Sequence, residues 1–293
     1  CIIMRTMDEI KTNAHAKINI VLDVTGKRDD GYHLVRMIMQ TVELHDVVVL
    51  KRRPGTGQIN IVCSSPDVPS GQANIAWRAA RAVMDRSGIN DDIDIVIEKN
   101  IPMAAGMAGG STDAAAVIRA MDTVFELDMG DKEKADIALS LGADVPFCLH
   151  RGTWLSEGIG EVLTPIHQMP QASVLIVNPG FEVSTAHVYK ALDEEQVPVH
   201  PDVDSCISLM EKGDIRQIAA SMGNILQKVT EKEHPVISQI RSEMTALKAA
   251  GSLMTGSGPT VFGLYEDEAD AFAAREYFEN RNYGKCFVTH FVY

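Results

Sequence analysis

A stretch rich in small residues carries the clearest chemistry in the sequence. It runs from Ile101 to Ala115, reads IPMAAGMAGGSTDAA, and leads into a stretch expected to be helical. Small side chains let backbone N–H groups approach an anion, and a helix N-terminus adds unpaired donors and the positive end of its dipole. The pattern predicts a site for a di- or triphosphate. Ser111 and Thr112 would add hydroxyl donors or a magnesium ligand.

Other interpretations of this loop remain open. Neither of the common phosphate-loop patterns, G-x-x-x-x-G-K-[ST] or G-x-G-x-x-G, occurs in the chain. A helix capped by a Ser, Thr or Asp after a flexible loop would look similar. A second small-residue loop, Thr255–Thr260, would alone be an ordinary turn. Two such loops in one chain suggest that the far half folds back toward the first loop.

Lys17 and Asp144 form a second candidate group. Alternating apolar residues predict a strand in which Lys17 lies opposite Ile18, with Asn19 turned the other way. Asp144 lies in the apolar stretch LGADVPF, where an unpaired charge is costly. A lysine and an aspartate in such surroundings are candidates for a catalytic pair. A structural ion pair, or a lysine whose stem lies along apolar surface, explains the pattern equally well.

The elements that must position these residues mix strands and helices without strict alternation, which favours an α+β fold over a doubly wound sheet. Period-two patterns predict strands at 14–25, 37–50, 59–62, 93–97, 174–177, 260–265 and 286–292, with a hairpin over 153–162 around Glu157 and Gly158. Helical spacing predicts helices at 74–87, 113–125, 132–141, 186–194, 203–230, 235–250 and 268–281, with a loop over 251–259.

Length and composition limit the remaining possibilities. The 293 residues predict two domains, 1–163 and 164–293, with a junction near 165–170, because domains commonly hold ~100–200 residues. The formal net charge of −13 argues against a nucleic-acid or anionic-membrane partner. No run of apolar residues is long enough to predict a membrane span.

Cysteine use favours a reducing compartment. The five cysteines are an odd number, lie far apart and show no zinc spacing. The first residues also lack the pattern of a signal peptide. We therefore expect a cytoplasmic protein, either a monomer or a homodimer.

Three segments together resemble the GHMP small-molecule kinases. They are the segment around Lys17, the loop over 102–115 and the loop over 251–260. Three strings strengthen the resemblance, which runs in order over nearly the whole chain: AHAKINI at 14–20, GKRDDGYH at 26–33 and LGADVPF at 141–147. The departures are small: Ala104 and Ala108 stand where many members have Gly, and Met107 stands where Leu is usual.

The resemblance implies a two-domain α+β kinase with an inter-domain active-site cleft, ATP as phosphate donor and Mg²⁺ as its companion. Asp144 would accept the proton of the acceptor hydroxyl, and Lys17 would keep that carboxylate ionised. The first domain would hold most of the ATP site. Its ATP-binding residues would be Pro102, Met103, Ala104, Ala105, Gly106, Met107, Ala108, Gly109, Gly110, Ser111 and Thr112, with Lys99 and Asn74 near the adenosine. The metal ligands are not identified, and Glu157 is only a candidate.

The likeness is greatest to the family member that acts in non-mevalonate isoprenoid precursor synthesis. It implies a small-molecule acceptor, a cytidine diphosphate-linked sugar alcohol. The residues implied for the acceptor are Asn19, Tyr32, His33, Thr185 and Tyr189. By themselves, Tyr32 and His33 are more typical of a surface turn, and Tyr189 fits a helix core residue equally well. A GHMP kinase with another acceptor, and a catalytically silent nucleotide-binding protein of the same fold, remain alternatives.

Overall fold

The computed structural model describes residues 2–5, 8–195 and 199–293. The chain forms two compact units, and each is assembled from three segments. The first unit comprises Cys1–Ala16, His45–Ile101 and Ala108–His150. The second comprises Lys17–Leu44, Pro102–Met107 and Arg151–Tyr293. Strands and helices are mixed in both units, which confirms the α+β class. A boundary between residues 163 and 164 remains a prediction of the sequence.

Five strands contribute to the first unit: β1 (Ile2–Arg5), β2 (Glu9–Lys27), β3 (His33–Arg53), β4 (Ile59–Cys63) and β5 (Asp92–Glu98). β2 and β3 are long enough to continue from one unit into the other. In the first unit, β1 pairs antiparallel with the start of β2, and the end of β3 pairs antiparallel with β5. β4 completes this side of the sheet by pairing parallel with β5.

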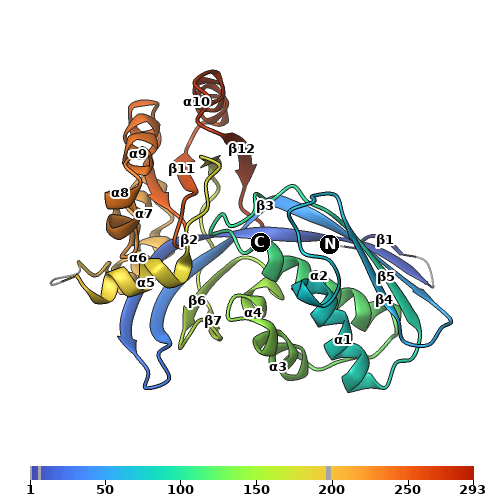
Figure 1. Ribbon diagram of the computed structural model, residues 1–293. Helices are drawn as coiled ribbons and strands as arrows, with labels where there is room; N and C mark the ends of the chain where they lie inside the picture. The colour runs from blue at the N-terminus through green and yellow to red at the C-terminus, as the bar shows by residue number, and fades with distance from the viewer. Residues whose placement is uncertain (1, 6–7, 196–198) are drawn as a thin grey trace. The chain divides into compact units, whose positions relative to one another are not determined.

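Helices of the first unit pack around α2, and Figure 1 shows them grouped together. α1 (Ile75–Ser87), α3 (Asp131–Leu141) and the short α4 (Val145–Cys148) all contact α2 (Gly109–Val124). A single turn of 3-10 helix, Gly71–Ala73, precedes α1. α1 and α3 confirm the sequence prediction, because they end at Gly88 and Gly142 as expected. The apolar positions of α2 are buried almost without interruption.

The start of α2 differs from the prediction. The helix begins at Gly109, one turn earlier than the expected start at Asp113. Ala108 caps it from the left-handed region, at a φ of 58°. The amide of Thr112 then donates to the carbonyl of Ala108 at 2.9 Å and closes the first turn. Gly109 and Gly110 have low helix propensity, so the sequence pattern places this turn in the loop.

The second unit contains a hairpin and a separate antiparallel sheet. β6 (Thr153–Glu157) and β7 (Val162–Pro165) form the predicted hairpin, and β6 also pairs with β3. The separate sheet has the order β10-β11-β8-β12, and its strands are β10 (Gly251–Met254), β11 (Val261–Tyr265), β8 (Ser173–Asn178) and β12 (Lys285–His290). Every residue of β8 and β11 is buried. α9 (Val236–Ala246) packs on β10 and β11, and α10 (Glu268–Asn280) packs on β8 and β12 (Figure 1).

Two predictions for the second unit are wrong in detail. The single helix expected over 203–230 is three helices, α6 (Val203–Lys212), α7 (Ile215–Ser221) and α8 (Gln227–Glu233). Gly213 ends α6 in the left-handed region, and Gly223 and Asn224 form β9, which pairs parallel with β2. The loop expected over 251–259 begins with strand β10, whose pairing with β11 outweighs the low strand propensity of Gly251. The remaining helix, α5 (Thr185–Asp193), lies where predicted.

Among the described residues, no helix combines the length and the apolar character needed to cross a membrane.

Candidate active site

Two loops of small residues meet in the second unit. Gly106 has a φ of 70°, and a Cβ added there would lie 2.3 Å from the carbonyl oxygen of Thr255. The hydroxyl of Thr255 donates to the carbonyl of Gly106 at 3.4 Å. The far half of the chain was expected to fold back to the first loop. These contacts confirm that expectation for residues Pro102–Met107 of the first loop. Position 106 requires glycine both for its backbone conformation and for this close approach.

Asn19 connects the first strand to the second loop. Its fully buried amide oxygen accepts hydrogen bonds from Lys17 Nζ at 2.8 Å, from the Gly256 amide at 3.1 Å and from Thr255 Oγ1 at 3.3 Å. Lys17 and Asn19 therefore share one face of β2, and the prediction that Asn19 turns the other way is wrong. The reason is strand geometry, because residues two apart point to the same side. Only 5% of Lys17 is exposed, so its ammonium is held at a fixed place.

The backbone of the same strand also contacts the first loop. The amide of Lys17 donates to the carbonyl of Met107 at 3.3 Å. The second unit thus brings together three of the predicted elements: Lys17, Asn19 and the loop over 102–107. Thr255 and Gly256, from the second small-residue loop, belong to this group too, although neither was predicted individually as a site residue.

The start of α2 in the first unit has the properties expected of a phosphate site. The amides of Gly109, Gly110 and Ser111 lie in the first turn, where a helix leaves its N–H groups without intrahelical acceptors. The positive end of the helix dipole adds to their attraction for an anion. A Cβ at position 109 would lie 3.2 Å from Cγ2 of Ile101 and 3.4 Å from Nζ of Lys99. The helix start therefore packs closely on the residues that enter the loop.

Asp144 stands at the N-terminus of α4 and is partly exposed. Its side chain accepts no capping hydrogen bond from that helix. At the other end of α4, Nη1 of Arg119 donates to the carbonyl of Cys148 at 2.6 Å. Burial lowers the pKa of Arg119. Arg119 thus fixes the short helix that carries Asp144. The pairing of Asp144 with Lys17 stays a prediction.

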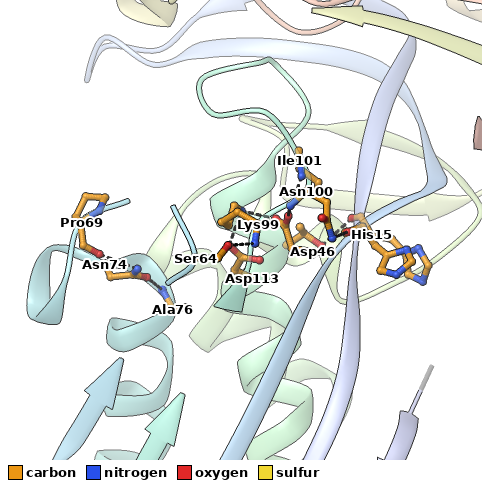
Figure 2. Close-up of polar contacts among 12 residues, drawn as sticks. His15, Asp46, Ser64, Pro69, Asn74, Ala76, Lys99, Asn100, Ile101 and Asp113 are labelled. Atoms are coloured by element: carbon orange, nitrogen blue, oxygen red, sulfur yellow. Dashed lines mark hydrogen bonds and ion pairs between the residues drawn. The ribbon is translucent and has the colours of Figure 1, made fainter. Parts of the chain in front are cut away.

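The side chains of Asn74 and Lys99 are engaged within the first unit (Figure 2). Asn74 caps α1, because its Oδ1 accepts from the Ala76 amide at 2.8 Å and its Nδ2 donates to the Pro69 carbonyl at 2.9 Å. The Lys99 ammonium is paired with the carboxylates of Asp46 and Asp113. A contact of either residue with adenosine would therefore use backbone or aliphatic atoms. Asp46 was not predicted from the sequence, although an acidic residue directly before the apolar run Val47–Val49 is a signal.

Two residues predicted for the acceptor site, His33 at the start of β3 and Tyr189 in α5, lie side by side. The rings of His33 and Tyr189 lie 4.8 Å apart between centroids, inclined at 38°. His33 Nε2 also lies 2.7 Å from Asp193 Oδ1, and Lys27 Nζ donates to Asp193 Oδ2 at 2.6 Å. The hydrogen bonds from Lys27 and His33 lower the pKa of Asp193. Tyr32, next to this group in sequence, is 60% exposed.

One face of α5 accounts for this grouping. Thr185, Tyr189 and Asp193 are spaced four residues apart, so they lie along one side of the helix. The hydroxyl of Thr185 lies 2.9 Å from that of Ser257, in the second glycine loop. Asp193 was not predicted from the sequence, and Ser257 was predicted only as a member of the second small-residue loop. The four-residue spacing from Thr185 is a signal that could have identified Asp193.

The described residues include no cluster of His, Cys, Asp or Glu arranged to hold a metal ion. Thr112 Oγ1 donates to the carbonyl of His15 at 2.7 Å, and Glu157 accepts from Arg36 at 3.2 Å. The Thr112 hydroxyl and the Glu157 carboxylate are thus engaged by other groups, and they do not form a set of protein ligands for Mg²⁺. This arrangement fits a Mg²⁺ that arrives with the nucleotide, because this ion keeps most of its water and binds substrate phosphates.

Comparison with known proteins decides the family. The model of the GHMP kinases N terminal domain matches residues 74–152, and that of the GHMP kinases C terminal matches residues 206–285. The chain is also 47% identical to the 4-diphosphocytidyl-2-C-methyl-D-erythritol kinase of Acetivibrio thermocellus, over 97% of this chain and 99% of the relative. The chain belongs to the GHMP kinase family. The prediction of a small-molecule kinase is thereby confirmed, and membership implies the use of ATP.

Other relatives agree in sequence and in fold. The protein of the same name from Clostridium beijerinckii is 43% identical over 88% of this chain and 91% of its own length. A crystal structure of 4-(cytidine 5'-diphospho)-2C-methyl-D-erythritol kinase matches with a TM-score of 0.81 and 30% identity, over 96% of this chain and 98% of that one. Homoserine kinase from Cytophaga hutchinsonii, at 20% identity and a TM-score of 0.78 over 99% of this chain and 97% of its own, shares the fold.

Proposed function

We propose that this GHMP kinase transfers the terminal phosphoryl group of ATP to the 2-hydroxyl of 4-diphosphocytidyl-2-C-methyl-D-erythritol, a step in isoprenoid precursor synthesis. The observation that carries the proposal is the 47% identity to the Acetivibrio kinase of that name over nearly the full length of both chains. The grouping of His33 with Tyr189 supports a ring-binding acceptor site.

The nucleotide would be held mainly by the backbone. Phosphoryl transfer depends on positioning and on stabilising charge more than on covalent help from the protein. The N–H groups at the start of α2 would donate to the phosphates, and the loop over 102–107 would add further backbone donors. Mg²⁺, bound with the nucleotide, would neutralise phosphate charge, with the Ser111 hydroxyl as a protein ligand. Asn74 and Lys99 would contribute to the adenosine side of the site.

Asp144 and Lys17 would act on the acceptor hydroxyl. Asp144 would accept the proton as the oxygen attacks the terminal phosphorus, and a positioned base of this kind contributes ~10²–10⁴ in rate. The Lys17 ammonium would favour the ionised carboxylate. Its bond to Asn19 Oδ1 holds the ammonium in place, and the amide group of Asn19 would contact the substrate near the reacting hydroxyl.

The cytidine end would be bound by aromatic rings. A pyrimidine stacked on an aromatic side chain gains ~1–3 kcal/mol. Tyr189 and Tyr32 would supply rings, and His33 would supply a donor or acceptor for the cytosine edge. The Thr185 hydroxyl, beside Ser257, would complete the acceptor contacts.

An assay of ADP release with a panel of alcohols tests the proposal. The panel contains the cytidine diphosphate-linked sugar alcohol, its uridine analogue, homoserine, mevalonate and phosphomevalonate. We expect turnover with the cytidine compound and at least ~10-fold lower kcat/KM with each of the others, the discrimination given by one lost polar contact or ring. Preference for another alcohol would identify a different GHMP kinase. ADP binding without turnover of any alcohol would favour a silent nucleotide-binding protein.

A further inference from the structure

A buried charge cluster ties together the two ends of the candidate nucleotide loop. Lys99 follows β5 directly, and its side chain is only 4% exposed. Its Nζ is paired with Asp46 Oδ2 and lies 2.7 Å from Asp113 Oδ2. The side chains of Asp46 and Asp113 are 0% and 4% exposed. Figure 2 shows the two carboxylates on either side of the ammonium.

Asp46 holds the entry to the loop. Its Oδ1 accepts the backbone amides of Asn100 at 2.5 Å and of Ile101 at 2.8 Å. Asn100 Nδ2 donates in addition to the carbonyl of His45 at 3.0 Å. One carboxylate therefore fixes two consecutive amides just before the loop and also the ammonium of Lys99.

Asp113 holds the exit from the loop. It lies one turn into α2, and the same ammonium that binds Asp46 donates to it. Gly109, the first residue of α2, packs closely on two of the same residues, because a Cβ there would lie 3.2 Å from Cγ2 of Ile101 and 3.4 Å from Nζ of Lys99. The direction of the first N–H groups of α2 is thus coupled to the position of the Lys99 ammonium.

The protonation of the cluster is consistent with this geometry. Burial raises the pKa of Asp113 to about 8, although the Lys99 charge opposes the shift. Burial lowers the pKa of Lys99, but the charges and hydrogen bonds of Asp113 and Asp46 together raise it above its ordinary value. The second oxygen of Asp113, Oδ1, is buried without a hydrogen-bond partner.

We infer that Lys99 is a positioning residue: its ammonium, clamped between Asp46 and Asp113, fixes the entry and the exit of the nucleotide loop and so aims the α2 amides at the phosphates of ATP. This inference rests on the proposed use of the loop for nucleotide. It does not depend on the identity of the acceptor.

A matched pair of variants tests the inference. Asp113→Ala and Asp113→Asn both leave Lys99 with the single carboxylate of Asp46, but only asparagine can still accept a hydrogen bond from the ammonium. We expect Asp113→Ala to raise KM for ATP, and Kd for Mg²⁺–ADP by calorimetry, by about tenfold, as for loss of a hydrogen bond to a charged group. KM for the acceptor should change less than about twofold, and Asp113→Asn should restore ATP binding to within about threefold of wild type.

Two further variants complete the test. Asp46→Asn removes a carboxylate oxygen at the loop entry, and its KM for ATP should rise at least as much as that of Asp113→Ala. Val83→Ala, a fully buried position of α1, is the control for a general loss of stability and should leave KM for ATP unchanged. The inference is overturned if folded Asp113→Ala binds Mg²⁺–ADP like wild type, or if KM rises equally for ATP and acceptor. Because ADP binding is measured without acceptor, a wrong acceptor assignment would not affect it.

Discussion

His33 Nε2 lies 2.7 Å from Asp193 Oδ1, and the His33 ring lies against Tyr189, one turn earlier in the same helix. A carboxylate at Nε2 favours a proton on that nitrogen and leaves Nδ1 as the group that can meet a ligand. Lys27 binds the other oxygen of Asp193 and holds the carboxylate in place. Asp193 therefore sets the orientation of the ring that we propose for the cytosine edge.

This relationship predicts the effect of two substitutions on acceptor binding. His33→Ala should raise KM for the cytidine substrate by about tenfold or more, because one base contact is lost, and leave KM for ATP unchanged. Asp193→Asn should raise the same KM by a smaller factor, because the ring stays but its orientation is weaker. Steady-state kinetics with each substrate varied in turn measures both. Equal increases in KM for ATP and acceptor would contradict the assignment.

Removal of the candidate base should separate chemistry from binding. Asp144→Asn keeps the size of the side chain but cannot accept the proton, so kcat should fall at least ~100-fold. Binding of Mg²⁺–ADP, measured by calorimetry, should stay within about twofold of wild type because no phosphate contact is assigned to Asp144. Unchanged turnover would reject Asp144 as the base.

The hydrogen bonds to Asn19 Oδ1 are expected to stabilise the fold. Asn19→Ala removes the acceptor for Lys17 Nζ, Thr255 Oγ1 and the Gly256 amide, so the free energy of unfolding should fall by about 2–3 kcal/mol. Urea denaturation measures this loss. Asn19→Asp keeps an acceptor oxygen for these donors and serves as the control. If both variants unfold like wild type, the bonds around Asn19 contribute no stability.

The Asp113 carboxyl should make stability depend on pH. Its folded pKa of about 8 lies above the ordinary value of 3.8, so the folded state keeps a proton that the unfolded state has lost between these pH values. Stability attributable to this group therefore falls as pH rises from about 4 to about 8. Asp113→Asn removes this dependence. The free energy of unfolding of the variant minus that of wild type should therefore be at least about 1 kcal/mol larger at pH 8 than at pH 5. Urea titrations at both pH values measure the difference. A constant difference would place the Asp113 pKa outside this range.

The sequence predicted elements well where local chemistry determines them. Asn74 and Gly88 are standard signals for the ends of α1, and both act as such. Prediction from the sequence failed where pairing between distant segments determines the secondary structure. Gly251–Met254 is a strand only because β11 lies beside it, and nothing in the local pattern indicates that neighbour.

The candidate site was predictable to a similar degree. Lys17 and Asp144 are conspicuous because charges are rare in apolar stretches, and Gly106 is conspicuous in a loop of small residues. Asp46 and Asp193 escaped notice because each acts through another side chain, Lys99 in one case and His33 in the other. Such indirect roles depend on long-range contacts, which composition and spacing do not encode.

The approach of Gly106 to Gly256 has a consequence for how this enzyme can change over evolutionary time. Each glycine has backbone of the other loop where its own Cβ would go: 3.0 Å from the Gly106 Cα for a substituted Gly256, and 2.3 Å from the Thr255 oxygen for a substituted Gly106. A methyl group at position 106 requires the facing backbone to move, and one at position 256 requires a smaller shift together with a left-handed backbone at φ 58°. The two loops lie 150 positions apart in the sequence (256 − 106), yet a substitution at either glycine requires the backbone of the other loop to shift. We therefore expect the two loops to evolve together.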